Sequence, residues 1–257
     1  MLRFKSLGSG STGNATLVEA GGLLPFRLLV DCGLGPRQLA LRLAQAGLAL
    51  QDIDAIFITH EHSDHIGCAH ALALRHRIPV WMSQGTHWAT GAPDYEGLLH
   101  IARDAQAIDL GGLQIMPFSV PHDVREPLQL SCTDGSAKLG IVTDLGHATA
   151  QVLSHLQGCH ALLLESNHDT DLLSQSAYPP FLKRRVGGNH GHLSNGAAAA
   201  IAGAVHHGGL RHLVAAHLSA KNNRPSLVQG TLSHALGCTP ADIVVAGPID
   251  GTPWLAL

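Results

Sequence analysis

One run of six residues, His60-Glu61-His62-Ser63-Asp64-His65, constrains this chain more than any other feature. It directly follows residues 54–59, a compact apolar segment that predicts a buried β-strand. Side chains two residues apart on an extended chain point to the same side, so His60 and His62 can bind one cation together. The last two residues of the run lie at the turn into the next helix and can reach a second cation. The alternative is a polar loop that happens to carry three histidines.

Histidine is abundant in a chain that is otherwise poor in charge. There are 19 histidines among 257 residues, while charged residues make up 14%, against about 25% in an average protein. Imidazole and carboxylate together suit zinc, manganese or iron rather than calcium. A hydrophobic content of 45% excludes a disordered chain. Lys+Arg 16 against Asp+Glu 19 leaves a net charge of −3, which excludes a wholly basic nucleic-acid coat but allows a local basic patch.

The five cysteines are widely spaced and form no C-x-x-C pair, so neither a disulfide framework nor a zinc finger is expected. The first seven residues lack the apolar core of a signal peptide. No segment approaches the roughly 18 apolar residues that span a bilayer. We therefore expect a cytoplasmic protein with reduced thiols and no membrane partner. No pattern predicts an oligomeric state.

Strand and helix patterns alternate along the chain, with no repeat, linker or low-complexity tract. The patterns predict strands at residues 15–20, 28–31, 54–59, 78–82, 113–120, 138–143, 162–165 and 213–216, and helices at 36–48, 66–76 and 196–206. Ser194 is placed to cap the last of these helices. Beyond residue 216 we expect loop and a short strand. The pattern predicts one α/β domain over residues 1–257, with helices covering sheets.

The metal-binding run and its position after a strand resemble the metallo-β-lactamase-fold hydrolases, and the resemblance spans nearly the whole chain. It implies an αββα four-layer sandwich, with metals in a cleft at one edge. It also implies further ligands at later strand ends, namely His122, Asp144 and His217. Asp123 is the rival to His122. Asp31 matches a family aspartate that supports the ligand turn instead of binding metal.

The resemblance implies two ligand sets that share one carboxylate. One set is His60, His62, His122 and Asp144, and the other is Asp64, His65, Asp144 and His217. A carboxylate can hold two cations about 3.5–4 Å apart, as two-metal hydrolysis requires. The expected cofactors are therefore two divalent metal ions, zinc or manganese, with iron as a further candidate.

Three details narrow the choice within the family. The diiron oxidoreductases usually carry glutamate where this chain has His62, and the zinc β-lactamases usually place a cysteine near the position of Asp144. Redox chemistry and antibiotic hydrolysis are therefore disfavoured. The stretch Gly191-His192-Leu193-Ser194-Asn195 resembles the tRNA-processing and nuclease branch, in which a histidine before the helix lies close to the scissile phosphate. His192 matches that residue.

Within this branch the chain resembles the YycJ/WalJ-type group of single-domain DNA exonucleases. The segments that carry the resemblance are residues 6–14, 120–123, 165–169, 191–195 and 216–223. The resemblance implies a metal-dependent phosphodiesterase, DNA exonuclease-like, whose partner is a nucleic acid, with DNA favoured. Its predicted catalytic residues are His192 and Asp64. Here a metal-activated water attacks phosphorus, while His192 neutralises phosphoryl charge and protonates the leaving oxygen.

Other residues are candidates for supporting the metal site or contacting the substrate, and each also has a purely structural interpretation. Glu165 and His168 follow a strand and are expected to line the cleft or orient His192, or else to form a local polar turn. The glycine-rich loop that ends at Asn14 either presents N–H groups to a phosphate or simply connects a hairpin. The basic run Lys183-Arg184-Arg185 either follows a phosphate backbone or forms a solvated face.

Two rival functions stay open. The first is a hydrolase of the same fold that acts on a thioester, a lactone or a small phosphodiester. The segment 120–127, rich in proline, differs from the corresponding stretch of glyoxalase-type members. The second is a metal-binding sensor or scaffold without turnover, against which the complete ligand set and His192 argue.

Overall fold

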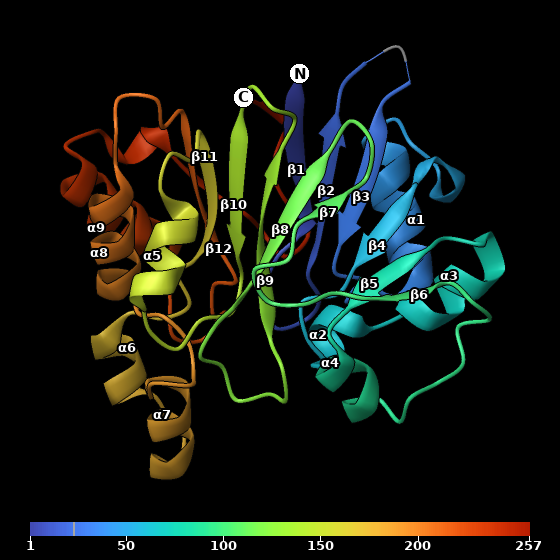
Figure 1. The fold of residues 1–257 in the computed structure, drawn as a ribbon. Helices are drawn as coiled ribbons and strands as arrows, with labels where there is room; N and C mark the ends of the chain where they lie inside the picture. Colours follow the sequence, from blue (N-terminus) through green and yellow to red (C-terminus); the bar gives the residue numbers. More distant parts are fainter. Residues whose placement is uncertain (23) are drawn as a thin grey trace.

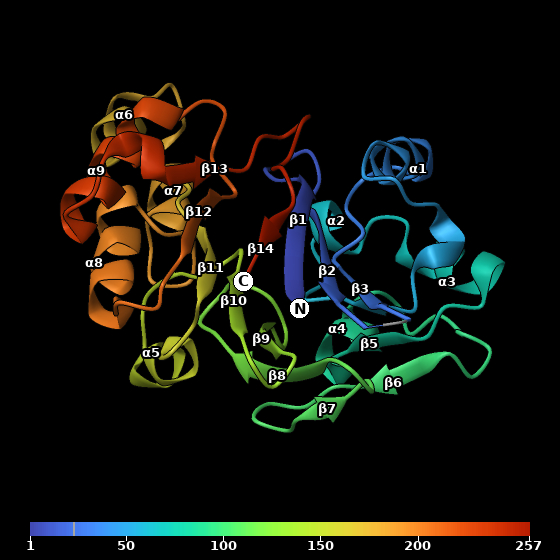
Figure 2. The ribbon, with the colours of Figure 1, turned by 90° about the horizontal axis from the view of Figure 1, so that it is seen from above.

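The computed structural model describes residues 1–22 and 24–257. Two sheets lie face to face, and helices cover the outer face of each (Figures 1 and 2). The expected αββα sandwich is therefore confirmed.

Sheet A contains the first strands of the chain and its last strand. Its order is β14 (Leu255–Ala256), β1 (Leu2–Gly8), β2 (Ala15–Ala20), β3 (Phe26–Val30), β4 (Ala55–Phe57), β5 (Val80–Met82) and β6 (Leu99–Ile101). Sheet B contains the strands between. Its order is β13 (Ile243–Val245), β12 (His212–Ala216), β11 (Ala161–Glu165), β10 (Lys138–Val142), β9 (Leu128–Thr133), β8 (Gln114–Ser119) and β7 (Ile108–Asp109).

The helices follow the same division. The sheet A half carries α1 (Pro36–Gln45), α2 (Ser63–Ile66), α3 (Ala69–His76), α4 (Gln84–Ala89) and the short 3-10 helix Leu50–Asp52. The sheet B half carries α5 (Ala150–Leu156), α6 (Thr170–Gln175), α7 (Pro180–Val186), α8 (Asn195–Val205), α9 (Pro225–Leu236) and the 3-10 helix Pro240–Asp242. In the described part of the chain, none of these helices has the length and apolarity to cross a bilayer.

The alternation of side chains along each strand builds three apolar layers. In β2, Val18 packs between the sheets with residues such as Leu130 and Val214, while its neighbour Leu17 packs under the helices with Leu39 and Leu43. A third layer joins the outer face of sheet B to α5, α8 and α9. Because the strands are buried on both faces, their sequences show continuous apolar runs instead of a polar–apolar alternation.

Strand direction brings the functional segments to one edge. β10, β11 and β12 run parallel, and β8 runs the same way because both β8 and β10 are antiparallel to β9. In sheet A, β1, β3 and β4 likewise share a direction, since β2 is antiparallel to β1 and β3. The carboxyl ends of these strands therefore carry the loops that form the site.

The helix predicted at residues 66–76 is broken into two. α2 begins at Ser63, inside the histidine run, and Gly67 separates it from α3. Gly67 has a φ of +32°, and a Cβ at this position would lie 2.3 Å from the carbonyl oxygen of Cys32. The close approach of the two chain segments thus decides this break, and no local pattern reveals it.

The prediction of loop and a short strand beyond residue 216 was correct for the strand but missed a helix. α9 covers twelve residues there and packs on α8, with Val228 and Leu232 buried. It begins with Pro225 and is followed by Gly237 at a φ of +67°, which are ordinary start and stop signals for a helix. Its sequence is rich in small and polar residues, so its apolar face gave a weak helical pattern.

Candidate metal centre

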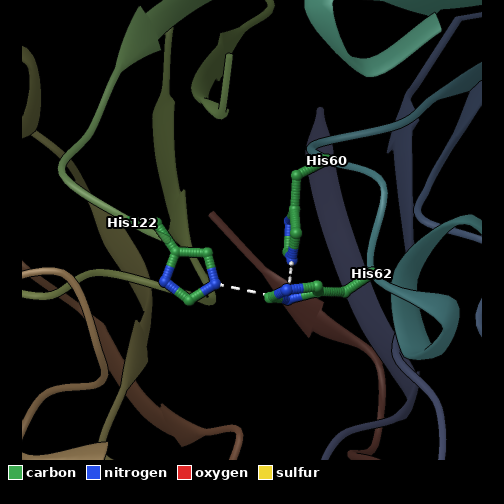
Figure 3. A group of neighbouring side chains, drawn as sticks. All are labelled: His60, His62 and His122. Carbon is green, nitrogen blue, oxygen red and sulfur yellow. Dashed lines mark hydrogen bonds between the residues drawn. The ribbon is translucent and has the colours of Figure 1, made fainter. Parts of the chain in front are cut away.

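Three histidine rings from two sheets meet at one point. His60 and His62 come from the turn after β4, and His122 comes from the loop after β8 (Figure 3). The Nδ1 atom of His62 lies 3.1 Å from Nε2 of His60 and 3.4 Å from Nε2 of His122. Atoms of these three rings that could bind a metal lie within 4.8 Å of one another. The predicted first ligand set is brought together in space.

The second set of candidate ligands lies beside the first. Asp64 and His65 begin the short helix α2, and His217 follows β12. Oδ2 of Asp64 lies 3.4 Å from Nε2 of His217 and 3.7 Å from Nε2 of His65. Two segments 150 residues apart in the sequence therefore converge on one point.

Asp144 lies between the two sets, in the loop after β10. Its Oδ2 atom lies 2.7 Å from Nε2 of His65 and 3.9 Å from Nε2 of His60, and its Oδ1 atom lies 3.9 Å from Nε2 of His122. Both oxygens are buried and lie close to ring nitrogens of His65, His192 and His217, but none of these contacts has the geometry of a hydrogen bond. Such unsatisfied buried oxygens are costly unless a cation binds them. The donor set therefore fits a pair of divalent cations.

Neighbouring charges shift the pKa values of the buried groups in this cluster. Burial lowers the pKa of His65, but the carboxylates of Asp144 and Asp31 outweigh it and raise that pKa to about 10. His217 shifts in the same direction, since Asp144 again outweighs burial and holds its pKa well above the usual value. Burial alone would raise the pKa of Asp144, but the facing rings of His217 and His65 hold it well below its usual value. Metal binding at these rings would therefore release protons.

Asp31 supports the turn formed by residues 60–65, which we call the ligand turn. Its Oδ2 atom accepts a hydrogen bond from Nδ1 of His65 at 2.7 Å, and its Oδ1 atom accepts one from the backbone N–H of Thr59 at 2.9 Å. Thr59 also places its hydroxyl 2.9 Å from Nδ1 of His60. Asp31 adopts a φ of +63°, which is rare outside glycine and is held here by these contacts. Sequence reasoning missed Thr59, whose position directly before the histidine run was the available signal.

The glycine-rich loop after β1 also supports the ligand turn. Asn14 donates its backbone N–H to the carbonyl of Asp64 at 2.8 Å, and its side-chain Nδ2 lies 3.1 Å from Nε2 of His65. Its Oδ1 atom accepts the N–H of Gly10. The backbone N–H groups of Ser9 and Gly13 also donate to protein carbonyls, so these four groups are not available to a phosphate.

Ser9 in the same loop positions the last candidate ligand. Its hydroxyl accepts the backbone N–H of His217 at 2.7 Å. His217 has a φ of +54°, so this contact holds a strained backbone in place. The role of Ser9 was not expected from the sequence, because its partner lies more than 200 residues away.

Glu165 and His192 form a pair at the side of the cluster. Nδ1 of His192 lies 2.7 Å from Oε1 of Glu165 and 2.9 Å from Oδ1 of Asp144. The other oxygen of Glu165 accepts the backbone N–H groups of Leu145 and Leu193. Burial lowers the pKa of His192, but the two carboxylates outweigh it and raise that pKa to about 10. Glu165 therefore contacts both the ring of His192 and the backbone of two loops.

The other predicted residues lie farther from the centre. His168 is buried, its Nδ1 atom has no hydrogen-bond partner, and burial lowers the pKa of the ring. Lys183 and Arg184 lie on α7 but outside the lining of the cleft. Arg185 reaches the cleft and places Nε 2.6 Å from Oδ2 of Asp123. Only one cation of the basic run therefore faces the cluster.

An open cleft with a cavity volume of about 320 Å³ adjoins the candidate ligands. Four of the candidate ligands line it together with His192, namely His62, Asp64, Asp144 and His217. The wall near α7 holds Arg185 and Tyr178, and α6 and α7 extend past sheet B at the lower left of Figure 1. Tyr178 was also missed from the sequence, since it stands alone among small and polar residues.

Gly33 offers a direct test of the support under the ligand turn. A Cβ at Gly33 would lie 1.7 Å from the carbonyl oxygen of Asp64. Gly33→Ala is therefore expected to displace the turn, to lower the free energy of unfolding by about 1–3 kcal/mol and to reduce bound metal per chain. Gly35→Ala is the matched control, because its Cβ would meet nothing within 4 Å. Urea unfolding and elemental analysis measure the two effects. Equal results for both variants would contradict this expectation.

Comparison with known proteins agrees with this geometry. Residues 8–164 match the family described as the metallo-beta-lactamase superfamily. The chain is 33% identical over 240 residues to the exodeoxyribonuclease YycJ of Bacillus anthracis, covering 91% of this chain and 89% of that protein. It is 30% identical over 241 residues to the exodeoxyribonuclease WalJ of Streptococcus pneumoniae serotype 2, covering 91% and 88%. The predicted resemblance to the YycJ/WalJ-type group is confirmed.

Solved structures of low sequence identity share the fold. The metallo-beta-lactamase fold protein YhfI from Bacillus subtilis aligns with a TM-score of 0.76 at 17% identity, with both chains fully covered. Zinc-bound PqqB from Methylobacterium extorquens aligns with a TM-score of 0.74 at 16% identity, again with full coverage of both chains. From its sequence match, its fold and its cluster of candidate ligands, the chain belongs to the metallo-beta-lactamase superfamily of metal-dependent hydrolases.

Proposed function

We propose that this protein is a dinuclear metal-dependent phosphodiesterase that removes nucleotides from the end of a DNA strand. The observation that carries the proposal is the Glu165–His192 pair at the side of the cleft, 2.7 Å apart and next to Asp144. An imidazole held in this way can give a proton to a departing oxygen, a step that phosphodiester hydrolysis needs. The two exodeoxyribonucleases that resemble most of the chain support DNA as the substrate.

The proposed ligands divide as the sequence implied. His60, His62, His122 and Asp144 would hold one cation, and Asp64, His65, Asp144 and His217 would hold the other. When bound, zinc or manganese would supply a water whose pKa falls from about 16 toward about 7, and positive charge that stabilises the phosphoryl oxygens. Asp31, Thr59 and Asn14 would keep the ligand turn in register.

His192 is proposed to act as the general acid. Its Nδ1 atom faces Glu165, which leaves Nε2 to donate a proton to the leaving oxygen. The raised pKa of about 10 keeps the ring protonated at neutral pH before the cations bind. Arg185 is proposed to contact a phosphate at the cleft wall, with Asp123 fixing the direction of its guanidinium group.

End-labelled DNA tests this function directly. Purified protein is reconstituted with Mn²⁺ or Zn²⁺, its metal content is measured, and single- and double-stranded substrates are added. Release of labelled nucleotides from an end is the expected result. Hydrolysis of a thioester or lactone panel without any DNA cleavage would favour the other hydrolases of this fold. Full metal content with no turnover on any substrate would favour a metal-binding protein without catalysis.

Glu165→Gln is expected to lower kcat by about 10–100-fold, the usual cost of removing a residue that supports a reactive group. The amide either turns an N–H toward Nδ1 of His192 or opposes the N–H groups of Leu145 and Leu193. Both arrangements disturb the ring. Steady-state kinetics on labelled DNA measures the loss. A kcat within twofold of the parent value would contradict the role of Glu165.

A further inference from the structure

A second concavity, which we call the apolar groove, adjoins the metal cleft. It lies between the loops after β1, β12 and β13 and has a cavity volume of about 710 Å³. Its apolar lining includes Leu218, Pro225, Val245, Ala246, Pro248 and Ile249. The loops after β1 and β13 lie side by side (Figure 2), joined by a hydrogen bond from the N–H of Ser9 to the carbonyl of Gly247.

The apolar groove and the metal cleft are continuous. Ser11, Tyr178 and Ser219 line both of them. Tyr178 stands where they meet, and its ring lies 5.6 Å from the ammonium group of Lys221. A ligand that occupies both concavities would therefore lie against Tyr178.

The apolar groove also has positively charged side chains in its lining. Lys221 and Arg224 line it, both are exposed, and no acidic side chain shares its lining. The guanidinium group of Arg224 donates to the backbone carbonyls of Lys221 and Asn223, and no carboxylate in the described part of the chain forms an ion pair with it. The groove therefore combines an aromatic ring, an apolar wall and two cations.

We propose that the apolar groove binds the single-stranded end of the DNA substrate, with a base stacked near Tyr178 and the adjoining phosphates near Lys221 and Arg224. This inference rests on the proposed nuclease function. Bases stack on aromatic rings whatever their identity, and cations that follow a strand bind its phosphates. Ile249 also lines the groove and is 71% exposed, so it would cover the next base.

The small number of cations favours a single strand over a duplex. A duplex is held mainly by many phosphate contacts. This groove offers two cations and a wide apolar wall, in a chain whose net charge is −3. Unpaired bases can bury their faces against that wall, whereas a duplex presents its charged backbone there. Binding should consequently depend only weakly on salt, with a slope of log affinity against log salt of about −1.4 for two phosphates on a single strand.

Fluorescence anisotropy of the metal-loaded protein tests the inference. The probe is a short labelled phosphorothioate oligothymidylate, compared with a duplex of equal length. We expect tighter binding of the single strand. Tyr178→Ala should raise its Kd by about 5–150-fold, the range for loss of one stacked base. Lys221→Ala and Arg224→Ala should each make the salt slope shallower by about 0.7.

Ile249→Asp tests the apolar lining of the groove and has a matched control. It places a negative charge and removes an apolar contact, so Kd for the oligothymidylate should rise by about fivefold or more. Leu41→Asp makes the same kind of change on the exposed face of α1, away from the groove, and should leave Kd unchanged. Kinetics on labelled DNA and on bis(p-nitrophenyl) phosphate should show a larger loss for Ile249→Asp on DNA.

The outcomes separate this inference from the proposed function. If the parent protein cleaves DNA but prefers the duplex, or if Tyr178→Ala and Ile249→Asp bind the oligothymidylate as tightly as the parent protein, the groove assignment is wrong while the nuclease function stands. If the parent protein cleaves no DNA at all, the proposed function itself fails. A raised Kd in both groove variants, with an unchanged Kd in Leu41→Asp, supports the inference.

Discussion

Asp144→Asn is expected to reduce bound metal from two ions per chain to one or none, and to reduce DNA hydrolysis to background. Among the described residues, Asp144 is the carboxylate with contacts within 4 Å to rings of both ligand sets, with Oδ2 2.7 Å from His65 and Oδ1 3.9 Å from His122. An amide has no negative charge and only one oxygen, so it cannot bridge two cations. Residues that merely support a ligand cost about 10–100-fold when removed, and a shared ligand should cost more.

Elemental analysis of the purified variant and kinetics on labelled DNA measure this prediction. Asp109→Asn is the control, because Asp109 is an exposed carboxylate at the end of β7 that accepts only the N–H of Gly111. Circular dichroism on both variants verifies that the fold is retained. Two ions per chain in Asp144→Asn, with activity within tenfold of the parent protein, would show that Asp144 does not bridge the metals.

His192→Ala is expected to lower kcat on DNA by about 10²–10⁴-fold while two metal ions stay bound. The ring lies beside the ligand sets, and its Nδ1 atom is occupied by Glu165 and Asp144, so its removal should spare the cations. The variant thus differs from Asp144→Asn, in which the metals are lost with the activity.

The choice of substrate separates two roles for His192. The leaving group of bis(p-nitrophenyl) phosphate is acidic enough to depart without a proton, so His192→Ala should lose far less activity on it than on DNA. Equal losses on both substrates would point to charge stabilisation in place of proton transfer. Undiminished turnover on both would remove His192 from the mechanism. His190→Ala, an exposed residue two positions earlier, is the control and should match the parent protein.

Much of the site was accessible to sequence reasoning because it is encoded locally. The histidine run places several candidate ligands within six residues. Asp31, Asp144, Glu165 and His217 each lie at the carboxyl end of an apolar strand or within two residues of it. A polar side chain at the carboxyl end of a buried strand can be recognised from the neighbouring residues alone. The division of these residues into two metal-ligand sets came from the resemblance to a family.

Other features of the site could be identified only from the tertiary structure. The basic run at residues 183–185 looked uniform, but the orientation of α7 directs only Arg185 into the cleft. Ser9 acts on His217 through a backbone hydrogen bond across 208 positions, and Tyr178 faces both concavities from an irregular segment. No motif next to either residue in the sequence predicts these contacts.

Local order in the sequence determined that this chain forms buried strands, that polar residues follow them, and that imidazoles and carboxylates suited to two cations are among those residues. The tertiary structure alone decided which of those strand ends share an edge, how closely Gly33 and Gly67 let the ligand turn approach the strand below it, and where the apolar groove joins the cleft. The physical reason is that side-chain chemistry and strand periodicity act over a few residues. Sheet order and close backbone contact instead arise from packing between segments that the sequence separates by tens to hundreds of positions.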